Sequence, residues 1–172
     1  MSHPQDIYYK NHQFEYPELT QIIGELSTSS LIVILKEIRA NTSLIQSDLG
    51  GGEDRHFGLV CTNEVYEDLI PNAIPCICPG NPGRLQLELG MTQYAVAQAR
   101  DEHTDATRVF RGVIGVERAL QQQLVLAIKP KYLRVLRTLG TNKLTQTIPK
   151  IFDHLFSTYG DFTLLNLREL TA

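Results

Sequence analysis

The histidines and cysteines of this chain match no familiar catalytic or metal-binding spacing. None of His56, His103 and His154 falls in an HExxH spacing. The cysteines form no CxxC pair; they are Cys61, Cys76 and Cys78. A GxSxG nucleophile elbow and a cysteine-protease signature are also missing. The sequence therefore predicts a protein that is not an enzyme, with no catalytic residue, metal site or cofactor.

His103 lies among several acidic residues, and it offers the strongest case for catalysis. Asp101 and Glu102 precede it and Asp105 follows, so a small hydrolase using an acid–histidine cluster is an alternative. A solvated helix face explains the same residues and is favoured. His154, on an amphipathic segment, is interpreted as a partly buried structural residue.

The glycines Gly50 to Gly52 raise the question of phosphate binding. The Lys-Ser/Thr pair of a P-loop does not follow them, and no strand-to-helix fingerprint surrounds them. A flexible connection is the favoured interpretation.

A run of basic residues is the most promising binding feature. Between Arg108 and Arg137 the chain carries seven basic side chains against Glu117 alone, although its formal net charge is -3. We name four of them the basic quartet: Lys129, Lys131, Arg134 and Arg137. On a helix starting at Pro130, Lys131, Arg134 and Arg137 would form a slanted basic stripe, and with Lys129 they could contact RNA phosphates. A solvated helix face is the alternative.

The apolar periodicity predicts an all-α fold. The 172 residues are 42% hydrophobic and 20% charged, which is typical of a globular domain. Helical spacing or caps indicate helices over 27–41, 63–69, 92–111, 116–128, from 130 onward and 148–160, with a last turn or helix from Thr163. Gly112 and Gly115 are expected to break or kink the chain between two of them, and Gly160 to end another. The prediction is a bundle of six or seven short helices without strands.

Residues 1–18 are predicted to be an N-terminal arm, followed by one helical region over 19–172. Their aromatic residues can dock on a partner, but a loosely attached terminus is favoured. Within the helical region, a Pro/Gly-rich linker over 71–90 separates possible lobes at 19–70 and 91–172. The chain shows no signal peptide and no apolar run of about 20 residues, so a cytoplasmic location without a membrane partner is expected.

Three blocks of sequence resemble the Gag polyprotein of copia-like LTR retrotransposons, in its capsid region. The blocks are LGGGEDRHFGLV, FRGVIGVERALQQQLVLAIKPKYLRVLR and IFDHLFSTYGDFT, and the resemblance extends from about Leu19 to Leu170. The residues that carry it most clearly are Val116, Leu120, Leu124, Tyr132, Leu133, Leu155, Tyr159 and Gly160.

The resemblance implies a retroviral-capsid-like helical fold and a structural function. Such a protein, from a retrotransposon or a domesticated copy, assembles with copies of itself into a shell that can package RNA. The zinc knuckle and the protease, integrase and polymerase segments of the family are missing from this sequence. The alternative function is a small helical nucleic-acid-binding module that forms no shell.

Overall fold

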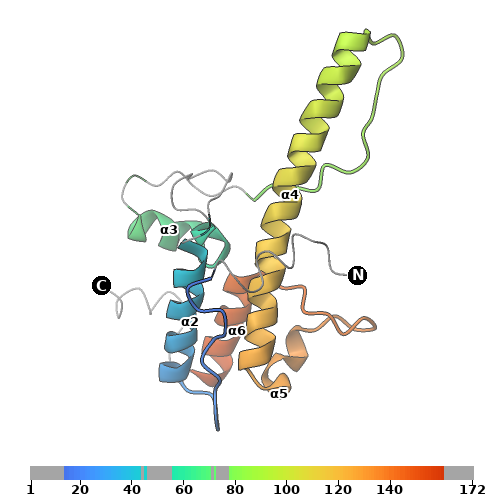
Figure 1. The fold of residues 1–172 in the computed structure, drawn as a ribbon. Helices are drawn as coiled ribbons and strands as arrows, with labels where there is room; N and C mark the ends of the chain where they lie inside the picture. The colour runs from blue at the N-terminus through green and yellow to red at the C-terminus, as the bar shows by residue number, and fades with distance from the viewer. Residues whose placement is uncertain (1–13, 44, 46–55, 71, 73–77, 161–172) are drawn as a thin grey trace.

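A computed structural model describes residues 14–43, 45, 56–70, 72 and 78–160, and this part of the chain is mostly helical (Figure 1). Its elements, in order, are α2 (Thr28–Ser43), η2 (Phe57–Leu59), α3 (Asn63–Leu69), α4 (Gln93–Ala127), α5 (Pro130–Leu133), η3 (Arg134–Leu136) and α6 (Ile148–Tyr159), where η marks a 3-10 helix. The predicted glycine-rich loop at Gly50–Gly52 and the helix from Thr163 lie outside the described residues. Over the described ranges no strand forms, and an isolated antiparallel bridge joins Arg137 to Leu144.

The predicted number of six or seven short helices is wrong, because the described residues form five α-helices. The largest difference is α4, a single helix of 35 residues where two were expected. Gly112 and Gly115 lie inside it without breaking it. A glycine costs a helix about 1 kcal/mol relative to alanine. Burial of Val116 and Leu120, both fully enclosed, offsets that cost.

Most predicted helix boundaries were confirmed. Thr62 caps α3 by accepting a hydrogen bond from the Val65 amide, and Thr92 caps α4 through the Ala95 amide. Pro130 occupies the first turn of α5, where its missing N–H is not needed. Thr147 precedes α6 but makes no side-chain cap bond.

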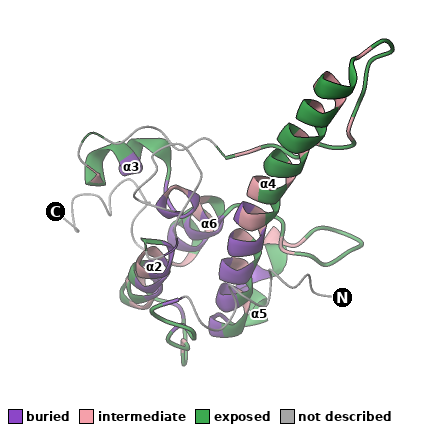
Figure 2. Cartoon of the chain, turned by 45° about the horizontal axis from the view of Figure 1, so that its top comes forward, coloured by how far each residue is buried: buried purple, intermediate pink, exposed green. Residues whose placement is uncertain are grey.

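The core lies where α2, α6 and the second half of α4 pack side by side (Figure 1). The apolar residues of α2 and α6 that recur at i, i+3, i+4 and i+7 are all buried: Leu31, Ile34, Leu35, Ile38, Ile148, Ile151, Phe152 and Leu155. Figure 2 shows buried residues concentrated in this region. Spacing at i, i+3, i+4 and i+7 places each set on one helix face. These two faces and the buried residues of α4 enclose a common interior.

Residues 14–19 are packed onto this body and are not a loose terminus. Phe14 and Leu19 are buried in the core. The Tyr16 amide donates to Asn41 Oδ1 at 2.7 Å, and Asn41 Nδ2 donates to the Tyr16 carbonyl and to Gln123 Oε1. Gln123 Nε2 donates to the carbonyls of Tyr16 and Pro17, both at 2.9 Å. This network joins the entering chain to α2 and α4.

The other aromatic residues of the predicted N-terminal arm, Tyr8 and Tyr9, lie outside the described residues.

The first half of α4 projects from the body (Figure 1). From residue 93 to residue 112 none of its residues is buried, and Figure 2 shows it mostly exposed. The described part of the predicted linker, residues 78–90, contains no helix and runs alongside this projection. His103 Nε2 contacts the Gly83 carbonyl at 2.8 Å and ties the two together. We name residues 80–111 the projecting arm.

Gly160 ends α6 as predicted, but its backbone is not left-handed, with a φ of -102°. A Cβ atom there would meet the Phe156 carbonyl oxygen at 2.9 Å and Thr28 Oγ1 at 3.2 Å. Because a backbone atom is fixed by its helix, Gly160→Ala is expected to lower the free energy of unfolding by about 1–3 kcal/mol. Urea denaturation followed by circular dichroism measures the change.

Gly112→Ala is the matched control. A Cβ at Gly112 meets nothing within 4 Å. Alanine is the better helix former, so this variant should gain about 0.5–1 kcal/mol. Equal effects of the two substitutions would contradict the close contact at Gly160.

Asn41 carries the second stability prediction. Asn41→Ala removes its bonds to Tyr16 and leaves the buried Gln123 side chain one partner short. We expect a loss of about 1–3 kcal/mol in the free energy of unfolding.

A double-mutant cycle with Gln123→Ala tests whether the two amides act together. The combined loss should be smaller than the sum of the single losses, because both amides hold the Tyr16 carbonyl. Strict additivity in urea denaturation would argue against a shared network.

Candidate functional site

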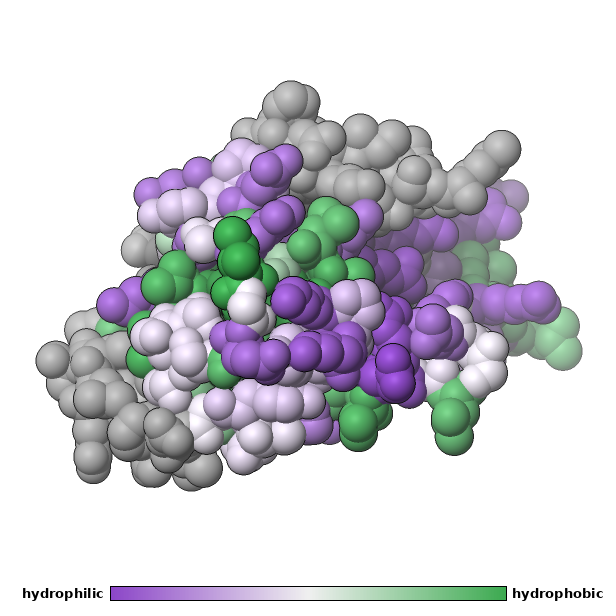
Figure 3. Space-filling view, turned by 90° about the horizontal axis from the view of Figure 1, so that it is seen from below, coloured by the Kyte–Doolittle hydropathy of each residue, from purple (hydrophilic) through white to green (hydrophobic). Residues whose placement is uncertain are grey.

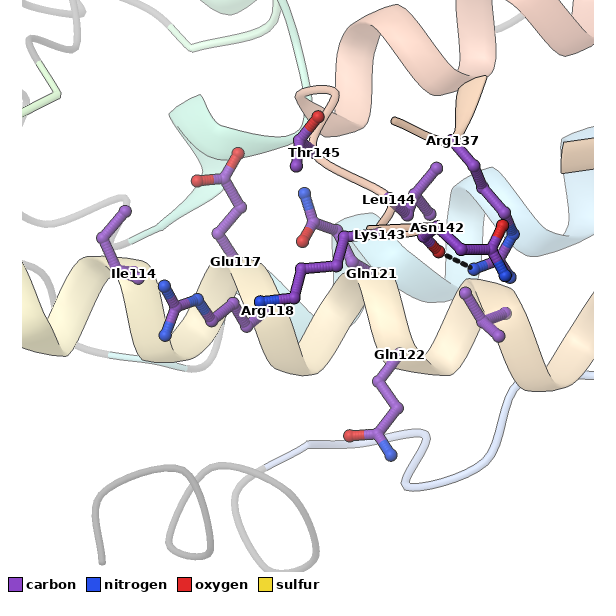
Figure 4. Close-up of a pocket in the computed structure, with 11 residues that line it drawn as sticks. Ile114, Glu117, Arg118, Gln121, Gln122, Arg137, Asn142, Lys143, Leu144 and Thr145 are labelled. Carbon is purple, nitrogen blue, oxygen red and sulfur yellow. Dashed lines mark hydrogen bonds between the residues drawn. The ribbon is translucent and has the colours of Figure 1, made fainter. Parts of the chain in front are cut away.

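A cationic groove lies between α4 and the loop that precedes α6, and Figure 4 shows its lining. Its volume is about 670 Å³. We name it the α4 groove; its lining residues are Ile114, Glu117, Arg118, Gln121, Gln122, Val125, Arg137, Asn142, Lys143, Leu144 and Thr145. This volume falls in the range of small-molecule binding sites, which is roughly 300–1,000 Å³.

The helix side of the groove follows from the sequence of α4. Ile114, Glu117, Gln121 and Val125 recur at three- or four-residue spacing, which places them along one face of the helix. Val116 and Leu120, on the neighbouring side of α4, are buried in the core. The groove therefore occupies the flank of a helix whose other side is fixed by packing.

The loop side is a tight turn held by its own backbone. The Thr138 amide donates to the Lys143 carbonyl at 2.8 Å, and the Asn142 amide donates to the Thr138 carbonyl at 2.9 Å. Positive φ angles at Gly140 and Asn142, 90° and 54°, allow the chain to reverse here. Gln121 Nε2 donates to the Gln146 carbonyl at 2.8 Å and fastens the loop to α4. Lys143 is thus held over the groove.

The charges of the groove are mainly positive. Arg118, Arg137 and Lys143 line it, and Figure 4 shows Lys143 extending from the loop toward α4. Among the described residues, no ion pair joins any of the three to a carboxylate. Glu117 is the acidic side chain of the lining. Burial raises the pKa of its carboxyl, and Arg118 acts in the opposite direction.

The basic quartet does not form one helix face, so the predicted slanted stripe is wrong. The helix from Pro130 ends at Leu133, tightens to a 3-10 turn and becomes extended at Arg137. Lys129 and Arg134 are exposed, and only Arg137 reaches the α4 groove. Its Nη1 donates to the Asn142 carbonyl at 2.9 Å, which Figure 4 marks.

Lys131 is engaged within the protein. Its Nζ pairs with Glu25 at 3.4 Å and lies 4.8 Å from the centre of the Tyr132 ring. The Tyr132 hydroxyl donates to the same carboxylate at 2.6 Å. The hydrogen bond from Tyr132 is the main cause that lowers the pKa of Glu25, followed by Lys131. This triad joins the segment before α2 to α5.

The residues that carry the family resemblance are packing residues. Six of them are buried: Val116, Leu120, Leu124, Tyr132, Leu133 and Leu155. Tyr159 is partly buried and meets Tyr132 edge to face, with ring centres 4.8 Å apart. Gly160 lies against α2. This part of the site prediction names residues of the core and not of the groove.

Each of the three histidines that the structure describes makes a contact within the fold. His103 contacts a backbone carbonyl, while Asp105 pairs with Arg108 at 3.0 Å. His56 is buried beside the Ile45 carbonyl, and His154 stands edge-on to Tyr159. Within the described ranges, histidines, cysteines and carboxylates form no group suited to a metal ion.

Cys61 borders a second pocket of about 290 Å³, beside Arg39 and Asp153. Burial raises the pKa of its thiol to about 12, against a smaller opposite effect of Arg39. A thiol protonated at neutral pH is a poor nucleophile. This pocket therefore lacks the thiolate that a cysteine hydrolase needs.

Sequence reasoning missed Arg118 and Lys143 as groove residues. Arg118 belongs to the helical face of Glu117 and Gln121, which apolar periodicity alone does not single out. Lys143 follows the turn signal Leu-Gly-Thr-Asn, which indicates a reversal of the chain near Arg137. Only the folded loop brings the two together.

Comparison with family models, with curated proteins and with solved structures finds no match for this chain. Among the described residues, no helix is both long and apolar enough to cross a membrane.

Glu25 carries a prediction about pH. Its folded-state pKa lies below the ordinary 4.5, so the triad stabilises the fold above 4.5 and loses this effect as the pH falls through the lowered value. Glu25→Gln should therefore lower the thermal midpoint at neutral pH, and the difference from wild type should shrink in acid. Differential scanning fluorimetry over a pH series measures it. A constant difference at all pH values would contradict the role of the carboxylate.

Proposed function

We propose that this protein is a structural, non-enzymatic protein that assembles with copies of itself, similar to the capsid region of a copia-type retrotransposon Gag or a domesticated copy. A shell built in this way packages RNA. The resemblance of three sequence blocks motivates the proposal, which keeps the all-α class and not the predicted retroviral-capsid-like bundle. The observation that carries self-association is the projecting arm.

The projecting arm is difficult to explain in an isolated molecule. An exposed helix of about this length is marginally stable in water, because most helical stability in proteins comes from packing of one face. Tyr94 and Leu89 are 79% and 106% exposed on it. Burial of such side chains against a second copy contributes about 25 cal/mol for each Å² of apolar surface. A partner molecule would supply the missing packing.

The charges of the arm favour a second copy as this partner. Both signs are present on it, with Arg84, Arg100 and Arg108 beside Glu88, Asp101 and Asp105. A surface of mixed sign can pair with itself when two copies meet in opposite directions. A strongly basic or acidic partner would find no complementary field there.

Other exposed apolar residues are scattered over the body. They include Ile23, Leu126, Val135 and Leu139. Figure 3, the view from below, shows apolar side chains among polar ones and isolated ones standing out at the rim. Single exposed apolar residues are normal for a monomer. They serve here as matched controls for the arm.

The test is the state of association of the purified chain. Mass photometry and negative-stain microscopy over a range of salt and protein concentrations should detect oligomers or particles. The double variant Leu89→Ser with Tyr94→Ser should weaken association by at least about tenfold, because two apolar contacts are lost.

The control is Val135→Ser with Leu139→Ser. It replaces two residues that are as exposed, 79% and 97%, but lie outside the arm. Association should remain within about twofold of wild type. A strict monomer under all conditions would sink the proposal, and loss of association in the control alone would move the contact away from the arm.

A second candidate function is a nucleic-acid-binding module without shell assembly. The three cations of the α4 groove favour it, since cationic side chains bind phosphates. Its signature is a monomer whose affinity for single-stranded RNA falls steeply with added salt.

A further inference from the structure

The α4 groove has the charge of an anion site. Arg118 and Lys143 come from two separate elements and lie toward one end of the groove, while Arg137 lies toward the other end (Figure 4). Like charges gathered in this way repel one another, and a bound anion removes that repulsion. Lys129 and Arg134 are not part of this lining.

The groove also has an apolar side. Ile114, Val125 and Leu144 are partly buried residues of its lining. The lining includes no aromatic ring, so a bound group would lie against aliphatic side chains. A ligand that matches both features combines an anionic group with a weakly polar body. The nucleotide unit has this composition, with a phosphate at one end and a base at the other.

Polar groups beside the cations can orient such a ligand. Asn142 and Thr145 belong to the loop that carries Lys143, and Gln121 is fastened to the Gln146 carbonyl. The hydrogen bonds of the turn hold these groups before a ligand arrives, which reduces the entropy lost on binding. Glu117 opposes an anion, and it is the only acidic residue of the lining.

We infer that the α4 groove binds a nucleotide unit, with the phosphate at Arg118 and Lys143 and the base against Val125 and Leu144. The unit is either a free nucleotide or part of a single-stranded RNA. The RNA form rests on the second candidate function. Neither form requires the protein to assemble.

Fluorescence polarisation of a labelled single-stranded RNA oligomer tests the inference, with AMP, inorganic phosphate and poly-glutamate as competitors. Arg118→Gln with Lys143→Gln should weaken RNA binding by about tenfold or more at low salt and reduce the salt slope by about two. AMP binding, followed by calorimetry, should be lost in parallel. Circular dichroism checks that each variant is folded.

Lys129→Gln with Arg134→Gln is the matched control. It removes the same two positive charges from the same molecule but outside the groove. Its RNA affinity should stay within about threefold of wild type. Glu117→Gln should tighten binding, because it removes the one negative charge of the lining. Lys143→Gln alone serves if the double variant does not fold, since Lys143 lies on an exposed loop.

The outcomes test the inference and distinguish its two ligand sources, a free nucleotide and a single-stranded RNA. Binding of RNA alone or of AMP alone through the groove supports it and names the source. Groove-dependent AMP binding without RNA binding removes the second candidate function but keeps the inference. RNA binding lost equally in the control overturns the groove while keeping that function. No binding of either ligand, or equal competition by poly-glutamate, overturns the inference.

Discussion

Burial of one face of α4 against α6 and the neighbouring α2 is the constraint on which the described structure depends. Leu120, Leu124 and Val116 are fully enclosed, and they meet the equally buried Phe152 and Phe156 of α6 in one core. A continuous apolar face of this kind outweighs the intrinsic preference of Gly112 and Gly115, so the helix runs through both. The same burial fixes the flank of α4 where the groove forms.

The two halves of α4 therefore have different physical roles. The second half is part of a core and is held by packing. The first half holds no buried residue between 93 and 112, and residues 80–90 run beside it, where His103 contacts the Gly83 carbonyl. Local stability should fall along the helix from the body to the tip. Self-association through the arm and ligand binding in the groove would act on separate ends of the same helix.

Polar networks complete what the apolar core begins. Asn41 and Gln123 fasten the chain before α2, and Glu25 with Tyr132 and Lys131 fastens α5 to the same entering segment. Because the basic residue Lys131 is engaged in that triad, it contributes less to any field at the surface than its position in the sequence suggests. The cations that share one groove are Arg118, Arg137 and Lys143.

The sequence by itself determined the helical class, the faces of α2 and α6 and the caps at Thr62, Thr92 and Pro130, because these depend on neighbours three or four residues apart. The separation of 1–18, 19–70 and 91–172 stays a prediction. Tertiary structure alone decided that α4 is continuous, that the helix after Pro130 is short and that Arg118 meets Lys143 across a groove. Each of these depends on contacts between distant segments, whose energies no local pattern contains.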